Sequence, residues 1–359
     1  MATRPAGVYD VTYQQDIAVV RTLPQWISLF IFLCFLAVFP ILFPNRYLLN
    51  LVNTILIFII SAYGLNILTG YAGQISVGHA AFMGVGAYAC ATFMTSLKLS
   101  FWISLPLSGI TAGLVGILFG FPSLRLKGFY LAMTTIAAQF IITSFFLHFY
   151  KPEVLGGVKF LSGVTLKPIQ LGSITFNTQE NLYYLIMPCT VIMTFFARNL
   201  VRSRLGRAFV AIRDNDLAAE IMGISLFHYK LKAFFIGCFF AGISGALYIA
   251  FMRIIRADQY TLMDSIWILG ILIIGGLGSH LGPIFGVIFV KLLDEVALLS
   301  APALGKMLPA DLSSRIGASM GLVIFGLIVV LFLILEPRGI AHRWEILKGR
   351  FRHWPFTYG

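Results

Sequence analysis

The sequence predicts an all-α membrane protein, a bundle of about eight to ten spans with some helices broken at glycines. Of its 359 residues, 59% are hydrophobic and only 11% are charged, whereas ordinary globular domains carry about 25% charged residues. The charged residues lie mainly between the apolar stretches, as they do in chains that cross a bilayer. Because this placement also accounts for the net charge of +12, a nucleic-acid binder, a soluble enzyme and a disordered chain are poor interpretations.

The apolar stretches give the predicted spans in order. Residues 1–25 are polar, and the stretch 26–43 after them is too long for a signal-peptide core and lacks a small-residue cleavage site, so we expect it to be the first span. Further stretches of spanning length follow at 48–68, 76–97, 101–121, 129–150, 182–197, 233–252 and 316–335.

A ninth apolar region is interrupted. Its halves, 266–277 and 281–293, are separated by Gly278, Ser279 and His280. If both halves cross the membrane the chain has ten spans, and if the pair is re-entrant it has eight. Both numbers place the two ends of the chain on one side, and we favour ten.

Basic residues predict the orientation, because Lys and Arg gather in cytoplasmic loops. The loop 198–232 and the tail 341–359 are rich in Arg and Lys, so both are expected in the cytoplasm. Alternation along the transmembrane domain, residues 26–340, then places the N-terminal segment 1–25 inside as well. The loops 150–181 and 253–264 fall outside.

The external loop 150–181 is the longest predicted connection. It contains several glycines and alternates polar and apolar residues at 173–176, a pattern that indicates a small β-hairpin or a surface helix. We interpret it either as a docking platform for an external partner or as a plain connector. The aromatic, basic tail is expected to lie at the membrane interface.

No pattern for catalysis or metal binding is found. Phosphate-loop, serine-hydrolase and metalloprotease motifs are absent, and the six histidines are scattered. The four cysteines lie far apart within apolar stretches, without metal-site spacing, and are expected to be buried apolar residues: Cys34, Cys90, Cys189 and Cys238. We therefore predict no catalytic residue and no metal, and consider a membrane-embedded enzyme poorly supported.

Two glycine-rich breaks, at 70–84 and 275–286, interrupt apolar stretches about 200 residues apart. Backbone leaves a helix at membrane depth only where protein or a water-lined cavity satisfies it, and paired breaks are typical of a transport pathway. Neutral amides and hydroxyls suit a zwitterionic solute, although interhelical hydrogen bonding and tight glycine packing would also explain them. The candidate pathway residues are Asn53, Asn66, Thr69, Gln74, Ser76, His79, Gly275, Gly276 and Gly278.

Residues 204–224 predict a short amphipathic helix in a cytoplasmic loop. Asp214 and Asp216 are candidate caps for its start, and Gly223 is a candidate end. Such a helix suits docking into a groove of another protein, or lies at the lipid headgroups. The residues that we single out in it are Gly206, Arg207, Ala208, Arg213, Asp214, Asp216, Ala219, Glu220 and Gly223.

Three segments, in this order and spacing, resemble the permease subunits of branched-chain amino-acid ABC importers, of the LivM type. They are 70–89 (GYAGQISVGHAAFMGVGAYA), 206–224 (GRAFVAIRDNDLAAEIMGI) and 275–286 (GGLGSHLGPIFG). The shorter segments 124–135 and 335–339 also fit, so the resemblance covers about residues 45–345.

The resemblance implies a multi-pass subunit of the cytoplasmic (inner) membrane. It would pair with a second, related permease and with two ABC ATPase subunits, which would carry ATP and Mg²⁺, so that this chain needs no cofactor. A periplasmic or extracellular solute-binding protein would deliver the amino acid, and residues 204–224 would form the coupling helix. The remaining partner would be membrane lipid, with no nucleic acid.

Other functions stay open at this point. A channel or secondary transporter would not need a helix that docks an ATPase. A similar ABC permease could carry another small polar solute, such as urea, an amide, an aromatic acid or a sugar.

Overall fold

The computed structural model describes residues 23–123, 129–148, 164–165, 169–171, 174–176, 178–305, 326–332, 334–336 and 338–353. These residues are almost entirely helical, which confirms the predicted all-α membrane bundle. The N-terminal segment 1–22, most of the external loop 150–181 and most of the predicted span 316–335 lie outside the described residues.

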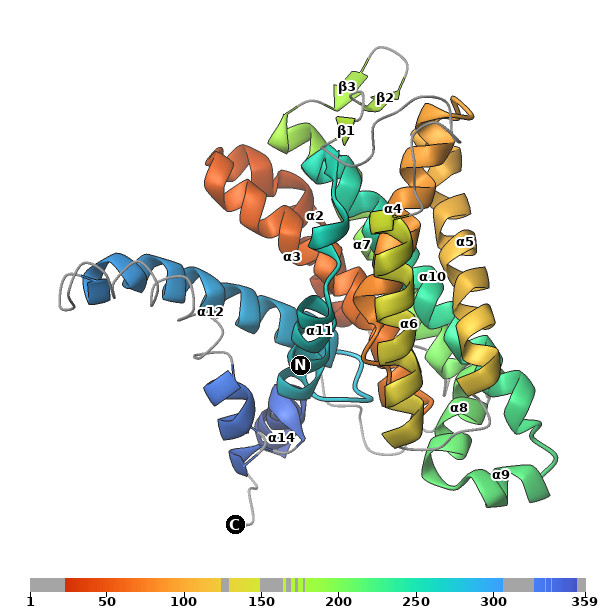
Figure 1. Cartoon of the computed structure of the whole chain (residues 1–359). Coiled ribbons are helices and arrows are strands. Elements are labelled where there is room, and N and C mark those ends of the chain that lie inside the picture. Colours follow the sequence, from red (N-terminus) through yellow and green to blue (C-terminus); the bar gives the residue numbers. More distant parts are fainter. Residues whose placement is uncertain are drawn as a thin grey trace.

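Long apolar helices make up the bundle (Figure 1). Within the described residues, five are long and apolar enough to cross a membrane: Arg46–Tyr71, Phe101–Pro122, Tyr130–Leu147, Gln179–Arg202 and Leu226–Met252. The main helices are α2 (Leu23–Leu42), α3 (Arg46–Leu65), α4 (His79–Thr95), α5 (Phe101–Ser123), α6 (Phe129–His148), α7 (Gln179–Arg202), α10 (Leu226–Met252), α11 (Leu262–Gly275), α12 (Gly282–Gly305) and α14 (Gly339–His353).

The centre of the bundle is α10, which packs against α3, α4 and α5. Its apolar residues occur on all sides, as in a helix surrounded by other helices. Lipid tails are as apolar as the helices, so association depends on close packing at small residues. At the α4–α10 contact a Cβ on Gly86 would lie 2.3 Å from the Gly242 Cα, so the two backbones touch.

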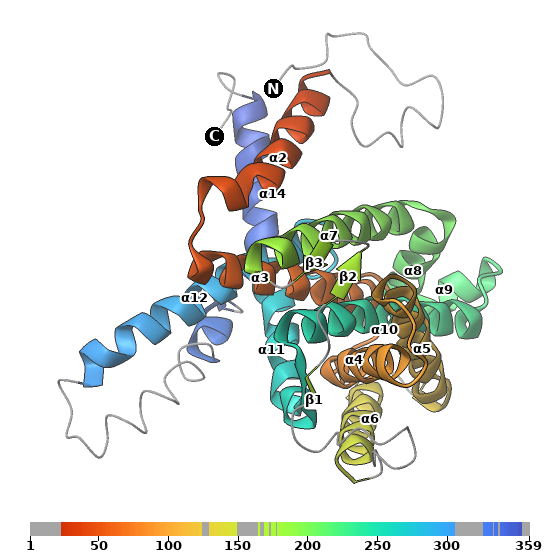
Figure 2. The same ribbon diagram turned by 90° about the horizontal axis from the view of Figure 1, so that it is seen from above.

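Peripheral helices expose large apolar side chains, as expected for surfaces that face lipid. Phe30 on α2, Leu118 on α5 and Phe140 on α6 are all exposed. Helix α12 extends away from the other helices, as both views show (Figures 1 and 2). It carries an ion pair between Lys291 Nζ and Asp294 Oδ2, 3.4 Å apart, at about the midpoint of its length.

The two ends of the bundle differ. Helices α8 (Arg204–Asp214) and α9 (Asp216–Ile221) lie at one end, and the short strands lie at the opposite end (Figure 1). Strands β2 (Ile169–Leu171) and β3 (Ile174–Phe176) form an antiparallel hairpin, which confirms that part of the prediction for the external loop. Strand β1 (Val164–Thr165) pairs with β4 (Ile254–Ile255), so both predicted outside loops meet at one end.

Two predictions need correction. Helix α4 begins at His79 rather than at residue 76 and has 17 residues, because residues 72–78 are not helical. Of the four cysteines, Cys90 and Cys238 are buried and Cys189 is half-buried, but Cys34 is exposed because α2 lies at the periphery. Helix α14 starts at Gly339, so the predicted tail 341–359 begins within this helix, where Ala341 is buried.

Candidate functional site

The first glycine break begins where α3 continues into the π-helix η1 (Asn66–Tyr71). The end of η1 is closed by two backbone bonds, from Ala72 N to Ile67 O (3.1 Å) and from Gln74 N to Leu68 O (3.0 Å). The chain then runs without regular structure to the start of α4 at His79. Single π-helical turns of this kind are rare in proteins and are found frequently at functional sites.

The second break joins α11 to α12. Ser279 Oγ donates to the Gly276 carbonyl (2.8 Å) and accepts from Gly282 N (3.0 Å), so this side chain closes the turn and caps the start of α12. Gly278 has a φ of +71°, a left-handed conformation that side chains other than glycine adopt with strain.

The two breaks are in direct contact. The Asn66 amide donates from Nδ2 to Ser279 O (2.8 Å), and its Oδ1 accepts from Gly278 N (2.9 Å). The Tyr63 hydroxyl donates to His280 O (2.8 Å). A Cβ on Gly70 would lie 2.5 Å from Gly278 N, so only glycine permits this approach. Segments that are far apart in the sequence therefore form one unit.

Side chains from α6 and α11 cap the start of α4. Val77 N donates to Thr135 Oγ1 (3.0 Å), Ala80 N to Ser265 Oγ (2.9 Å) and Ala81 N to Gln139 Oε1 (2.9 Å). These backbone donors are therefore engaged within the chain. No local sequence pattern marks these three side chains, because each lies on a helix distant from α4 in the sequence.

The predicted polar residues divide into two groups. Asn66 and Thr69 are used within the fold: Thr69 Oγ1 donates to Gln74 O (3.1 Å). The other four, Asn53, Gln74, Ser76 and His79, are buried and keep polar atoms without a partner: Asn53 Oδ1, both amide atoms of Gln74, Ser76 Oγ and His79 Nδ1. His79 Nε2 is 3.0 Å from Ser61 O. Unpartnered buried polar groups are costly and uncommon.

The remaining predicted glycines serve close packing. A Cβ on Gly275 would lie 2.1 Å from Gly282 O, and one on Gly276 would lie 2.8 Å from Arg338 O. They therefore hold α11 close to α12 and to the segment before α14. This is the tight packing that the sequence left open as an alternative.

The α8–α9 segment lies near the end of η1 that is farther from α3. It follows the predicted pattern with one correction. Asn215, rather than Asp214 or Asp216, caps α9: its Oδ1 accepts from Ala218 N at 3.1 Å. Asp214 instead pairs with Arg213. Gly223 ends α9 as predicted, with a φ of +83° and a bond from its N to Glu220 O (2.9 Å).

Burial separates the candidate residues of this segment. Gly206, Ala208 and Ala219 are buried, so their small size serves packing within the chain, whereas Arg207, Arg213, Asp214, Glu220 and Gly223 are exposed and Asp216 is half-buried. Three large apolar side chains are strongly exposed beside them: Leu217 (66%), Ile221 (85%) and Met222 (81%). We call these three the α9 apolar patch. Met222 was not identified from the sequence.

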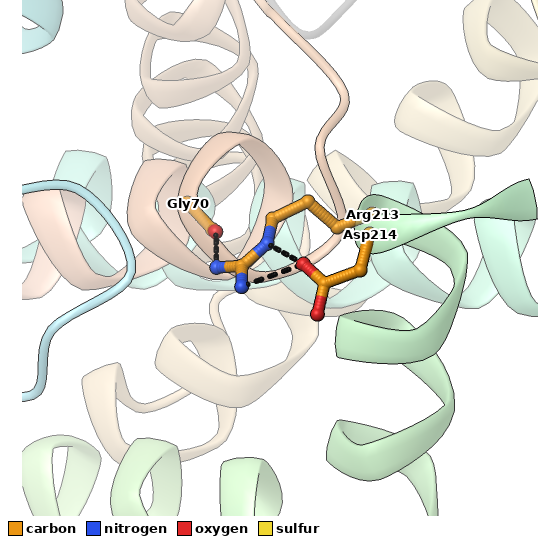
Figure 3. Close-up of polar contacts among 3 residues, drawn as sticks. All are labelled: Gly70, Arg213 and Asp214. Carbon is orange, nitrogen blue, oxygen red and sulfur yellow. Dashed lines mark hydrogen bonds and ion pairs between the residues drawn. The ribbon is translucent and has the colours of Figure 1, made fainter.

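Arg213 connects this segment to the first break, as Figure 3 shows. Its Nη1 donates to the Gly70 carbonyl (2.9 Å), and its Nε and Nη2 each lie 2.9 Å from Asp214 Oδ1. The end of α8 is thus bonded to the end of η1. No group of three or more His, Cys, Asp or Glu side chains placed to hold a metal occurs in the part of the chain that the structure describes.

Comparison with known proteins gives the family. A model described as the permease component of the branched-chain amino acid transport system matches residues 47–333. The chain is 29% identical over 335 residues to the high-affinity branched-chain amino acid transport permease LivM of Escherichia coli K12, covering 86% of this chain and 74% of the relative. It is 28% identical over 334 residues to LivM of Salmonella typhimurium, with the same coverage.

A more distant relative is the autoinducer 2 import permease LsrC of Escherichia coli, 27% identical over 222 residues, which are 60% of this chain and 62% of that protein. No solved structure matches the chain. ABC importers combine such permeases with ATPase subunits and a solute-binding protein. Over most of its length, therefore, this multi-pass membrane chain belongs to the family of branched-chain amino acid ABC transport permeases.

Proposed function

We propose that the chain is one of two related permease subunits that together enclose the pathway for a branched-chain or related amino acid. A periplasmic or extracellular binding protein delivers the solute, and two ATPase subunits hydrolyse ATP with Mg²⁺, so no cofactor binds to this chain. Family membership over residues 47–333 supports this assignment.

In this proposal the end with α8 and α9 faces the cytoplasm, and so do both termini. The excess of Arg and Lys in residues 198–232 supports this orientation. The end with β1–β4 then faces the binding protein, and the external loop 150–181 contributes to its docking platform.

We assign the solute pathway to the surroundings of the first break. The buried, unpartnered atoms of Gln74, Ser76 and His79 support this assignment, as does Asn53 Oδ1. Amides, a hydroxyl and an imidazole offer donors and acceptors without requiring a fixed charge, which suits a solute that is zwitterionic. Asn66, Thr69 and the glycines of the second break support the pathway by holding the two breaks together.

The single observation that carries the coupling role is the α9 apolar patch. Large apolar side chains exposed together at a loop end mark a protein or membrane contact, and a short capped helix suits a groove on a partner. We assign this surface to an ATPase subunit.

A double substitution tests this assignment. Ile221→Asp with Met222→Asp places two charges on the patch without touching the buried face of α9. We expect co-purification of the ATPase subunits to fall by about tenfold or more, as for loss of hot-spot residues, and ATP-driven uptake to fall with it. Substitution of buried Ala219 would be a poorer test, because it would disturb packing.

The matched control is Ile254→Asp, an exposed isoleucine on β4 at the opposite end. It should leave ATPase binding unchanged. Full ATPase co-purification with the double variant would contradict the assignment. Solute uptake that continues without any ATPase would instead favour a channel or secondary transporter.

A different solute is the second candidate within the same fold. The similarity to a permease that is named for autoinducer 2 import supports testing it. Competition of labelled leucine uptake by unlabelled valine, urea, benzoate and ribose separates the possibilities. We expect only the branched-chain amino acid to compete.

A further inference from the structure

We infer that Arg213 is a positioning residue that makes the two glycine breaks move together with the α8–α9 segment. The inference rests on the proposed function, because it assigns the route by which an ATPase acts on the pathway. It is carried by the position of one guanidinium group, which lies against the first break and the second break and is held by the neighbouring Asp214.

The contact with the first break is a hydrogen bond to the end of η1. Arg213 Nη1 donates to Gly70 O at 2.9 Å. Carbonyls in the last turn of a helix lack partners within that helix and carry partial negative charge, so a cation is favoured there. A Cβ on Gly73 would lie 2.9 Å from Arg213 Cγ, so the arginine stem also packs directly on the break.

The contact with the second break involves the same nitrogen. A Cβ on Gly278 would lie 2.9 Å from Arg213 Nη1 and 3.0 Å from Gly70 O. Gly278 therefore packs close to both Gly70 and the guanidinium, with no space for a side chain. Because Asn66 bonds to Gly278 N and Ser279 O, a displacement of η1 carries the second break with it.

Asp214 orients the guanidinium. Its Oδ1 accepts from Nε and Nη2 (Figure 3), which leaves Nη1 directed at Gly70. The side chains of this pair are 37% and 61% exposed, so the pair itself adds little stability and its effect is on geometry. Only the planar fork of arginine supplies donors in both directions.

The position of Arg213 in the chain links it to the docking surface. It lies in the last turn of α8, and Asn215, two residues later, is the N-cap of α9, which bears the apolar patch. A force applied to α9 therefore reaches Arg213 through two peptide units. We assign to Arg213 the transfer of that movement to both breaks at once.

The experiment uses the complete importer in proteoliposomes, made with Arg213→Ala, Arg213→Gln or Arg213→Lys. The readouts are the amount of assembled complex, ATP hydrolysis, and solute taken up per ATP hydrolysed. The control is Arg343→Ala, which removes an exposed arginine from an ion pair with Glu336 outside the proposed site.

We expect Arg213→Ala and Arg213→Gln to assemble and hydrolyse ATP, but to take up about tenfold less solute per ATP, within the range by which single residues alter coupling. Arg213→Lys should recover part of the loss, because its ammonium can still donate to Gly70 O. Arg343→Ala should behave as the unchanged chain. A merely structural role would lower the amount of complex and leave uptake per ATP unchanged.

A second readout tests joint movement of the breaks. Single cysteines replace exposed Ile75 in the first break or Leu277 in the second, with the four native cysteines replaced by alanine. We expect ATP to change the thiol-labelling rates at both positions in the unchanged background and at neither in Arg213→Ala.

The outcomes separate the two levels of the proposal. Normal uptake per ATP and normal ATP-dependent labelling in the Arg213→Ala or Arg213→Gln importer would overturn this inference and leave the proposed function intact. If the importer with the unchanged chain shows no ATP-dependent uptake, the proposed function fails and this inference fails with it.

Discussion

Replacing Asn66 by leucine tests how much its amide contributes to holding the two breaks together. The side chain is fully buried and lies between η1 and the turn before α12. Leucine has a similar shape but no polar atoms. The substitution therefore leaves Gly278 N–H and Ser279 C=O without their partner while the volume changes little.

The expected loss follows from the two bonds, of 2.8 and 2.9 Å. Interhelical hydrogen bonds in membrane proteins contribute about 0.6 kcal/mol on average and up to about 1.7. Two bonds therefore give about 1–3 kcal/mol of unfolding free energy, since both are lost together. The upper part of this range is expected, because both backbone groups are left without a partner.

Thermal unfolding of the purified protein in mild detergent measures the effect. Asn50→Leu is the matched control, because Asn50 is exposed on α3, the helix that continues into η1. We expect Asn66→Leu to unfold several degrees below the control, since about 1 kcal/mol lowers the Tm of a domain of 150–250 residues by about 2–4 °C. Equal Tm values for the two variants would refute the conclusion that Asn66 joins the breaks.

Three further predictions follow from particular contacts. Asn215→Ala removes the cap of α9 at a cost of about 1 kcal/mol, so ATPase binding should weaken about fivefold in a pull-down titration; unchanged binding would show that α9 is not the docking element. Gly86→Ala should overpack the contact with Gly242 and destabilise the chain by about 1–3 kcal/mol, which lowers the Tm. Gly326→Ala should leave the Tm unchanged, because its Cβ would meet no atom of the described residues within 4 Å. Equal Tm values for the two variants would contradict the close contact of α4 and α10. Ser279→Ala should destabilise the start of α12 by about 1 kcal/mol, seen as faster hydrogen exchange of Gly282 and its neighbours, and unchanged exchange would argue against the cap.

Much of the helical architecture follows from apolar length and from local signals. The predicted span 233–252 is the apolar part of α10, and the predicted end of α9 at Gly223 depends only on the left-handed backbone that glycine favours. The breaks were also found, because glycines inside apolar stretches are conspicuous. These features are determined within a few residues of each other in the chain.

Contacts between distant residues could not be predicted in the same way. Nothing near Asn66 shows that its amide meets Gly278 rather than a solute, and Gln139 gives no local sign that it caps α4. The choice of Asn215 over its two acidic neighbours was missed because all three residue types favour this position. Burial of Ala219 depends on how α9 lies against the bundle.

ATP-driven uptake tests the central claim most directly. Proteoliposomes would contain this chain with the second permease and the ATPases, the binding protein would be added outside, and ATP would be enclosed on the ATPase side. We predict accumulation of labelled leucine that requires ATP, the binding protein and this chain. Uptake at the same rate without ATP, or no uptake with every component present, would contradict the account.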